Sequence, residues 1–251
     1  MTLGFVIAPD FAPERISGWY MLSTALQRRS GIGLHLYMPA DAPEQAQLLE
    51  AGRGDLVYAN PFDASTLIRQ EGYVPFARPV ERPDEMVIAV VADAALQAVE
   101  DLRPGVRIAL TRNRDVRLIG LRLLEPADLD AGNVQWVDAS GYPAVARLLL
   151  QGQADAGFFL ASAWHELSSL TRSRLKPLVE SALCDITHVL LAHPRLGDKL
   201  PQVAQALLGV GKGEDAADRE VLEALGIPKG FEPMSAEDAE FMIDLMDTLL
   251  D

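Results

Sequence analysis

The chain has 251 residues, a formal net charge of −14 and 49% hydrophobic residues. This length predicts one large or two modest domains with a substantial apolar core. Nucleic acid and anionic membrane surfaces select clustered Lys and Arg, so this acidic chain is not expected to bind either. No apolar run approaches the about 20 residues of a membrane helix, so no membrane insertion is expected.

Strand and helix patterns alternate along the first third of the sequence. Apolar runs predict strands, and apolar residues at helical spacing predict helices, most of which end at a glycine. A stretch rich in proline and charge, residues 73–85, separates this part from the next strand. The predicted strands cover residues 3–8, 33–40, 55–59 and 86–92, and the predicted helices cover 14–31, 43–52 and 63–72.

The second part repeats this plan. We predict strands at residues 101–111, 134–140, 155–161 and 186–194, and helices at 114–125, 142–152, 162–170, 200–210 and 235–251, with a linker at 211–233. Alternation of this kind is typical of parallel sheets with crossover helices. The predicted fold is α/β with two similar lobes, each a mainly parallel sheet flanked by helices. Lobe 1 comprises residues 1–83 and 190–251, and lobe 2 comprises residues 84–189.

One phrase occurs twice. The segment "LLEAGRGDLVYANPF" at 48–62 and the segment "LLLQGQADAGFFLAS" at 148–162 share a Leu-Leu-x-x-Gly-x-x-Asp frame. Gly52 and Gly152 are predicted to end a helix in the left-handed conformation that glycine adopts most easily. Asp55 and Asp155 then precede a strand whose carboxyl end reaches the edge where α/β sheets bind ligands. A chance similarity between two ordinary helix-to-strand turns is the alternative.

The order of elements resembles that of type II periplasmic solute-binding proteins, in the phosphate, phosphite and phosphonate-binding subfamily. The segments that resemble the family in sequence are "LLEAGRGDLVYANPFDASTLIRQEGYVPFARP", "PAVARLLLQGQADAG" and "LEALGIPKGFEPMSAEDAEFMIDLM". The resemblance implies two lobes that close on a small ligand. It also implies two crossing strands that join the lobes, near Val80 to Met86 and Asp185 to Leu190.

In this family the ligand's anionic group is held by a Ser/Thr-rich turn at the start of a helix in the second lobe. Backbone N–H groups and the helix dipole favour an anion there. The matching turn here contains Thr111, Arg112, Asn113 and Arg114. The two guanidinium groups either replace the missing hydroxyls as anion donors or form solvated surface.

Four positions depart from the family pattern. Tyr142 stands at the position of a histidine, Glu85 and Ala42 at positions of aromatic residues, and Ser162 near the position of an acidic residue that some relatives use for a ligand amine. All four departures fall in the expected ligand site. The resemblance therefore predicts the scaffold more firmly than it predicts phosphonate as the ligand.

The remaining candidates are more aromatic and amide-like than charged, which suits a small organic molecule with a few polar contacts. Strand alternation places one of Phe158 and Phe159 in the core and the other outward or toward the ligand. The predicted ligand-binding residues are Tyr58, Asn60, Phe62, Glu85, Thr111, Arg112, Asn113, Ser140, Tyr142 and Phe158.

Motifs for other chemistry are missing. The four histidines have no metal-ligand spacing, and "HELSS" at 165–169 lacks the second histidine of a zinc-protease motif. Cys184 is the single cysteine, so it forms no disulfide within the chain, and we predict that it is a small core residue. No P-loop, Gly-x-Gly-x-x-Gly or Gly-x-Ser-x-Gly sequence is present. Neither a cofactor nor a metal is expected.

Three functions follow in order of preference. The first is a non-enzymatic binding protein whose closed state is read by an ABC transporter permease or a signalling partner. The second is a cytoplasmic enzyme on the same fold that acts on a small organic acid, and the third is a fold retained for protein interaction. The N-terminus has no signal-like segment. As it stands, the sequence predicts a cytoplasmic protein, or a periplasmic one if a signal was removed.

Overall fold

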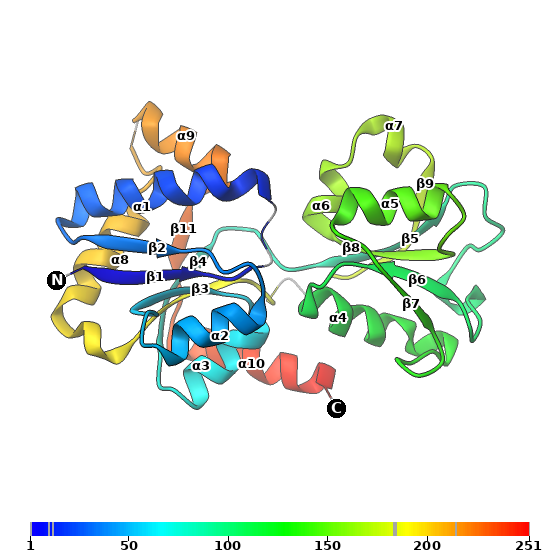
Figure 1. Cartoon of the computed structure of the whole chain (residues 1–251), viewed down its shortest axis with the longest axis horizontal. Helices are drawn as coiled ribbons and strands as arrows, with labels where there is room; N and C mark the ends of the chain where they lie inside the picture. The colour runs from blue at the N-terminus through cyan, green and yellow to red at the C-terminus, as the bar shows by residue number, and fades with distance from the viewer. Residues whose placement is uncertain (1, 10, 12, 183–184, 214, 251) are drawn as a thin grey trace. The chain divides into compact units, whose positions relative to one another are not determined.

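The computed structural model describes residues 2–9, 11, 13–182, 185–213 and 215–250 (Figure 1). The chain folds into two compact units. Unit 1 contains Met1–Arg82 and Thr187–Met246, and unit 2 contains Pro83–Ile186 and Asp247–Asp251. Each unit has its own sheet flanked by helices, which confirms the predicted α/β class. Cys184 lies outside the described residues.

Unit 1 is built on a six-stranded sheet with the order β11-β4-β10-β3-β1-β2. Strands β1, β2 and β3 are parallel, whereas β10 runs antiparallel to its neighbours β3 and β4. The strands are β1 (Leu3–Ile7), β2 (Leu34–Tyr37), β3 (Leu56–Ala59), β4 (Val74–Pro79), β10 (Val189–Ala192) and β11 (Phe231–Pro233).

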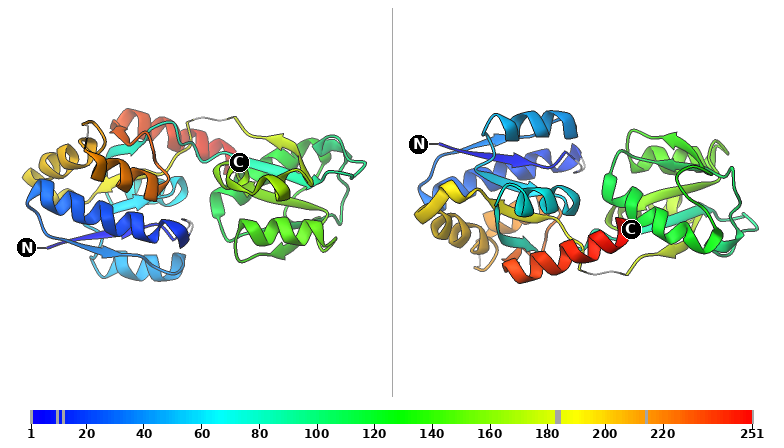
Figure 2. Two further views of the ribbon diagram at one scale, coloured as in Figure 1. Left: turned by 90° about the horizontal axis from the view of Figure 1, so that it is seen from above. Right: turned by 90° about the horizontal axis from the view of Figure 1, so that it is seen from below.

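Helices cover both faces of the unit 1 sheet, as the two views of Figure 2 show. Helices α1, α8 and α9 pack on one face around the buried side chains of Phe5, Trp19 and Leu222. Helices α3 and α10 pack on the other face around Val57, Leu67 and Ile243. The unit 1 helices are α1 (Ile16–Ser30), α2 (Ala42–Glu50), α3 (Pro61–Arg69), α8 (Leu200–Leu208), α9 (Ala216–Leu225) and α10 (Ala236–Leu250), with 3-10 turns at Pro13–Arg15 and Pro194–Lys199.

Unit 2 has a five-stranded sheet with the order β7-β6-β8-β5-β9, in which β6, β7 and β8 are parallel. Helix α4 covers one face, and α5 and α6 cover the other (Figure 1). The elements are β5 (Met86–Val91), β6 (Arg107–Leu110), α4 (Arg114–Leu124), β7 (Gln135–Asp138), α5 (Tyr142–Leu150), β8 (Ala156–Leu160), α6 (Ala161–Glu166), α7 (Ser169–Arg172) and β9 (Leu175–Glu180), with 3-10 turns at Val99–Asp101 and Glu125–Ala127.

The repeated phrase forms the same turn in both units. Gly52 has a φ of 68° and Gly152 a φ of 67°. The backbone N–H groups of Gly52 and Gly152 donate to Leu49 and Leu149 of the preceding helix, at 2.8 and 3.0 Å. The next residue in each copy also donates back into its helix, at 2.9 Å in both. The two phrases are therefore equivalent helix ends, each closed by a left-handed glycine.

The two segments expected to be crossing strands are only partly in strand conformation. Residues 80–85 contain a turn, in which Glu81 has a φ of 48°, and strand β5 begins only at Met86. On the return path, strand β10 begins at Val189. The N–H of Asp84 donates to the carbonyl of Ile186 at 2.7 Å. Pro83 has no N–H to donate, which shortens any ladder here.

Two regions to which the sequence analysis assigned no helix or strand contain such elements. The proline-rich stretch at 73–85 includes strand β4, where the register shifts next to Pro75, a site at which a sheet tolerates proline. The predicted linker at 211–233 contains α9 and β11. Helix α9 begins at an Asp215 cap and ends at a left-handed Gly226. Because its exposed face is acidic, this amphipathic helix was not predicted from composition. The residues at its two ends, Asp215 and Gly226, are typical helix-capping signals and would have indicated it.

Candidate functional site

The parallel strands of unit 2 end together. Leu110 of β6 pairs in register with Asp138 of β7, and the N–H of Ala139 donates to the carbonyl of Leu110 at 2.8 Å. The two strands lead directly into α4 and α5. The turns at residues 111–113 and 139–141 therefore lie side by side at the carboxyl edge of the sheet, where open α/β sheets bind ligands.

The first of these turns is held by its own polar side chains. Asn113 is the N-cap of α4, and its Oδ1 accepts from the N–H of Val116 at 3.0 Å. The N–H of Asn113 lies 3.4 Å from the hydroxyl of Thr111. Asn113 is buried and Arg112 is exposed. The turn therefore places the start of a helix and one guanidinium group at the sheet edge.

At the second turn the helix starts without a side-chain cap. Gly141 is the N-cap of α5. It has no side chain, so no side-chain hydrogen bond caps the first helical turn of α5. Ser140, the residue before it, is exposed, and Tyr142 is half-buried with its ring stacked on Phe159 at a centroid distance of 6.3 Å. Amide groups at such a helix start attract anions, because the helix dipole is positive there.

Glu85 lies at the same edge but is held inside unit 2. Its backbone carbonyl accepts from the N–H of Ala161 at 2.7 Å, at the carboxyl end of β8. Its carboxylate accepts from the hydroxyl of Ser181, which in turn accepts from the N–H of Met86 at 2.9 Å. Glu85 is 7% exposed. Its carboxylate fixes the start of β5, and a ligand contact by Glu85 remains a prediction.

Phe158 is a core residue, which corrects its prediction as a ligand contact. Both Phe158 and Phe159 have no exposed surface. The ring of Phe158 packs edge-on against Trp136 at 5.9 Å, whereas Phe159 packs against Trp164 at 5.3 Å. Strand alternation does separate the two rings, but helices cover both faces of this sheet, so neither ring faces a ligand.

The carboxyl edge of the unit 1 sheet carries a buried polar network. Asn60 follows β3 as the N-cap of α3, and its Oδ1 accepts from the N–H of Asp63 at 2.8 Å. The carboxylate of Asp63 accepts from Nδ2 of Asn60 at 3.2 Å and from Nε2 of Gln45 at 2.9 Å. Asn60 and Gln45 are 5% and 2% exposed. The network fixes the orientation of the Asn60 amide.

An aromatic cluster adjoins this network. Tyr58 lies near the end of β3, and its ring is 4.6 Å from Trp19 and 5.0 Å from His188, on which it stacks. Tyr58 is 6% exposed, so it belongs mainly to the core, and Phe62 is half-buried. Sequence reasoning missed Trp19 and His188 as neighbours of Tyr58. Their proximity depends on the packing of α1 and β10 against β3, which no local pattern reveals.

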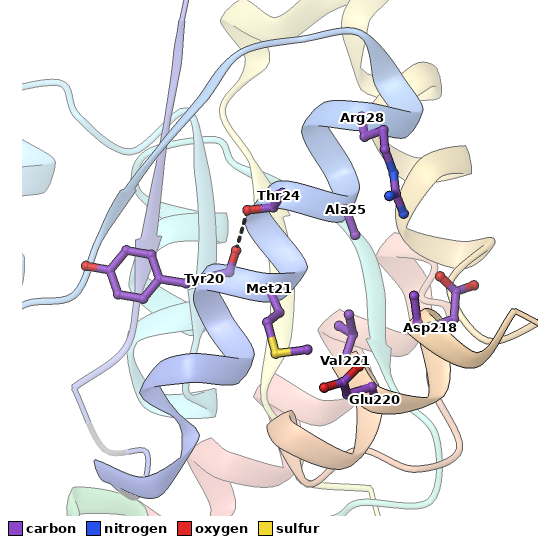
Figure 3. Close-up of a pocket in the computed structure, with 9 residues that line it drawn as sticks. Tyr20, Met21, Thr24, Ala25, Arg28, Asp218, Glu220 and Val221 are labelled. Carbon is purple, nitrogen blue, oxygen red and sulfur yellow. Dashed lines mark hydrogen bonds between the residues drawn. The ribbon is translucent and has the colours of Figure 1, made fainter.

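A separate pocket lies between α1 and α9 on unit 1, with a volume of about 300 Å³ (Figure 3). Met21, Ala25 and Val221 line it together with Arg28 and Glu220. It includes none of the predicted ligand-binding residues. Among the described residues no cluster of three potential metal ligands occurs. The helices in the described part of the chain include none that combines the length and apolar character needed to cross a membrane.

The chain belongs to the family of periplasmic substrate-binding proteins of phosphonate ABC transporters, because that family model matches residues 5–239. No curated protein matches the chain in sequence. The family members are substrate-binding proteins, not enzymes. The chain is accordingly a ligand-binding protein, and this supports the binding function over the enzymatic alternative.

Solved structures share the fold. PhnD1 from Prochlorococcus marinus, solved in complex with methylphosphonate, is 14% identical with a TM-score of 0.82, over 99% of this chain and 98% of that one. A phosphonate transporter binding protein from Pseudomonas aeruginosa is 14% identical with a TM-score of 0.76, over 100% and 89%. The sulphonate-binding protein SsuA from Escherichia coli is 18% identical with a TM-score of 0.67, over 99% and 91%. These likenesses establish the two-lobed type II binding-protein fold.

Proposed function

We propose that the chain binds a small organic anion of the phosphonate or sulfonate type and delivers it to an ABC transporter permease. In this proposal the anionic oxygens bind at the carboxyl edge of unit 2, to Ser140, Thr111, Arg112 and the amides at the start of α5. Tyr142 contacts the organic part. The observation that carries the proposal is the uncapped start of α5 next to the Thr111–Asn113 turn.

The chemistry of this edge favours a negatively charged group. Helix starts at α4 and α5 contribute partial positive charge, and Arg112 adds a full one. The hydroxyls of Thr111 and Ser140 are neutral donors that suit the tetrahedral oxygens of a phosphonate or sulfonate. The family match and the methylphosphonate complex of PhnD1 support the same class of ligand.

Binding to both lobes is expected to stabilise a closed form, which the permease would recognise. Small-angle scattering measures this step, because closure lowers the radius of gyration. A saturating ligand that leaves the scattering curve unchanged would reject closure while leaving the ligand assignment intact.

The ligand itself is tested first by native mass spectrometry of the freshly purified protein. A thermal-shift series then follows with methylphosphonate, inorganic phosphate, methanesulfonate, an amino acid mixture and small aromatic acids. A phosphonate or sulfonate should copurify or raise the melting temperature. A response to neutral or cationic compounds alone would contradict the proposal. Recovery of the bound compound unchanged distinguishes binding from turnover.

Variants locate the ligand. We expect Arg112→Gln and Ser140→Ala each to weaken the binding of the identified anion about tenfold, because each removes a hydrogen bond to a charged group. Arg219→Gln is the matched control, since it removes an exposed guanidinium from α9 of unit 1. Equal affinities in all three variants would place the anion elsewhere.

A further inference from the structure

A second pocket lies at the opposite edge of the unit 1 sheet, where β1, β2 and β3 begin. Its volume is about 620 Å³, within the range of small-molecule sites. Gly4 of β1 and His35 of β2 are paired in register across its floor. The lining consists of Thr2, Gly4, His35, Tyr37, Gly52, Arg53, Asp55 and Arg195.

Arg195 is a fixed cation in this pocket. Its Nε donates to Oδ1 of Asp55 at 2.6 Å, and its Nη2 donates to the carbonyl of Gly52 at 2.8 Å. The other carboxylate oxygen of Asp55 accepts from the N–H of Gly4 at 2.7 Å. The charge of Asp55 is therefore compensated within the wall, and the guanidinium plane of Arg195 is held in place before any ligand arrives.

Arg53 adds a second guanidinium. It is exposed, and within the described part of the chain its side chain makes no hydrogen bond or ion pair. Its backbone is tightly placed, because a Cβ added to Gly4 would lie 1.8 Å from the Arg53 carbonyl oxygen. With Arg195 and Asp55, the pocket carries a net positive charge in a chain whose total is −14. Paired guanidinium groups are suited to bidentate binding of carboxylate or phosphate.

Two rings form a wall beside these cations. The ring centroids of His35 and Tyr37 are 4.5 Å apart. An atom of the Tyr37 ring lies 3.3 Å from the position of a Cβ on Gly4, so the glycine leaves room for the ring at the pocket floor. Aromatic faces of this kind stack on flat ligands.

The second copy of the repeat provides an internal comparison. Asp155 also accepts from the backbone N–H of the neighbouring strand, here that of Arg107, at 2.9 Å. Arg107 stands where unit 1 has Gly4, and its own side chain turns onto Asp155 at 2.6 Å. The positions of Arg53 and His35 are occupied by Gln153 and Gln135. The hydrogen bond from a strand N–H to the aspartate occurs in both units and is therefore part of the scaffold. Arg53 and His35, in contrast, occur only in unit 1.

We propose that this pocket is a second ligand site, which takes a small aromatic anion. The flat ring of the ligand packs on His35 and Tyr37, and its carboxylate or phosphate group binds Arg53 and Arg195. The site lies at the amino edge of the unit 1 sheet and contains none of the residues proposed to bind the transport ligand. It therefore does not depend on the identity of that ligand.

Titrations followed by amide NMR test the proposal, with phenyl phosphate, benzoate and inorganic phosphate as separate probes. Phenyl phosphate or benzoate should shift the amide signals of residues 35–37 and 52–55. Phenyl phosphate should bind more tightly than inorganic phosphate, which lacks the ring, and comparison with benzoate shows which anionic group is preferred. Shifts confined to residues 111–113 and 140–144 would overturn the proposal, since they would place the probes at the other site. Equal affinity for phenyl phosphate and inorganic phosphate would overturn its aromatic part.

Two substitutions copy the second repeat into the first. Arg53→Gln should weaken the binding of phenyl phosphate about tenfold, because it removes a charge-assisted contact, and His35→Gln should weaken it by a smaller factor. Both side chains are exposed, so an unchanged melting temperature is expected. Arg112→Gln should leave the shifts at residues 35–37 and 52–55 unaltered. Unchanged affinity in Arg53→Gln would overturn the proposal.

Discussion

Gly120 lies directly against the ring of Phe158: a Cβ added to Gly120 would come within 2.2 Å of a ring carbon of that phenylalanine. The glycine belongs to α4 and the ring to β8. Helix α4 approaches its sheet this closely only because position 120 has no side chain. The placement of the Thr111–Asn113 turn at the start of α4 depends on this approach.

We therefore expect Gly120→Ala to lower the free energy of unfolding by about 1–3 kcal/mol, the usual cost of overpacking a core. Chemical denaturation measures this change. The double variant Gly120→Ala/Phe158→Leu should lose less stability than the sum of its single changes, because the clash is shared. Additive losses would show that the two residues are not coupled.

The left-handed turn at Gly152 leads to a second prediction. No atom lies within 4 Å of the position of an added Cβ at Gly152, so the cost of Gly152→Ala arises from backbone conformation alone. We expect a loss of about 1–2 kcal/mol in the free energy of unfolding. Gly213→Ala serves as the control, since Gly213 also faces open space and has no positive φ. Equal stability of the two variants would contradict the turn assignment.

Tyr73 predicts a loss of stability at alkaline pH. Its hydroxyl donates to the carbonyl of Gly54 at 2.7 Å, and burial raises its pKa from 10.0 to about 12. The raised pKa means that the folded state favours the neutral phenol. This contribution is complete below pH 10 and is lost as the pH rises toward 12.

Unfolding free energies measured between pH 8 and 12 check this prediction. The loss above pH 10 should be smaller in Tyr73→Phe than in the wild type. Tyr20→Phe, which removes a hydroxyl from a residue that is 56% exposed, should retain the wild-type loss. A wild-type slope in Tyr73→Phe would exclude Tyr73 as its source.

Asp155 predicts the opposite dependence in acid. Hydrogen bonds from Arg107, first from its side chain and then from its backbone, lower the pKa of Asp155 below 3.8. The stabilisation is complete above the unfolded-state pKa and disappears as the pH falls through the lower folded-state value. Asp155→Asn should be less stable than the wild type at pH 7, and this difference should shrink at pH values below 3.8. A difference that is constant with pH would show that the carboxylate charge is not involved.

Much of the scaffold could be predicted from local patterns. The helices ending at Gly31, Gly52 and Gly152 were expected from apolar spacing and a terminal glycine, and the structure contains all three. Strand β4 was missed, because prolines are unusual in a strand; the register shift of β4 against β10 lies beside Pro75. Helix α9 was missed because its charged face dominated the composition of its segment.

The candidate site was less predictable, because it depends on contacts between distant segments. The family resemblance pointed to the turn that contains Asn113, and the predicted strand ends pointed to Ser140. It gave no indication that Glu85 would be held by Ser181, 96 residues away. The role of Phe158 was misjudged, since alternation along a strand shows that two side chains diverge but not whether helices cover both faces. The ligand-binding residues as a set remain a prediction.

The order of segments in the two units has a consequence for synthesis. Unit 2 comprises mainly one continuous segment, Pro83–Ile186, whereas unit 1 is completed by segments that follow it. Strand β10 sits between β3 and β4 in the unit 1 sheet, so that sheet cannot close until residues 189–192 have left the ribosome. Domains generally fold during synthesis as their chains are completed, from the N-terminus onward. Here the order is reversed, because nearly all of unit 2 is synthesised before the last segments of unit 1. Until those segments are made, the sheet of unit 1 has an unpaired edge at β3.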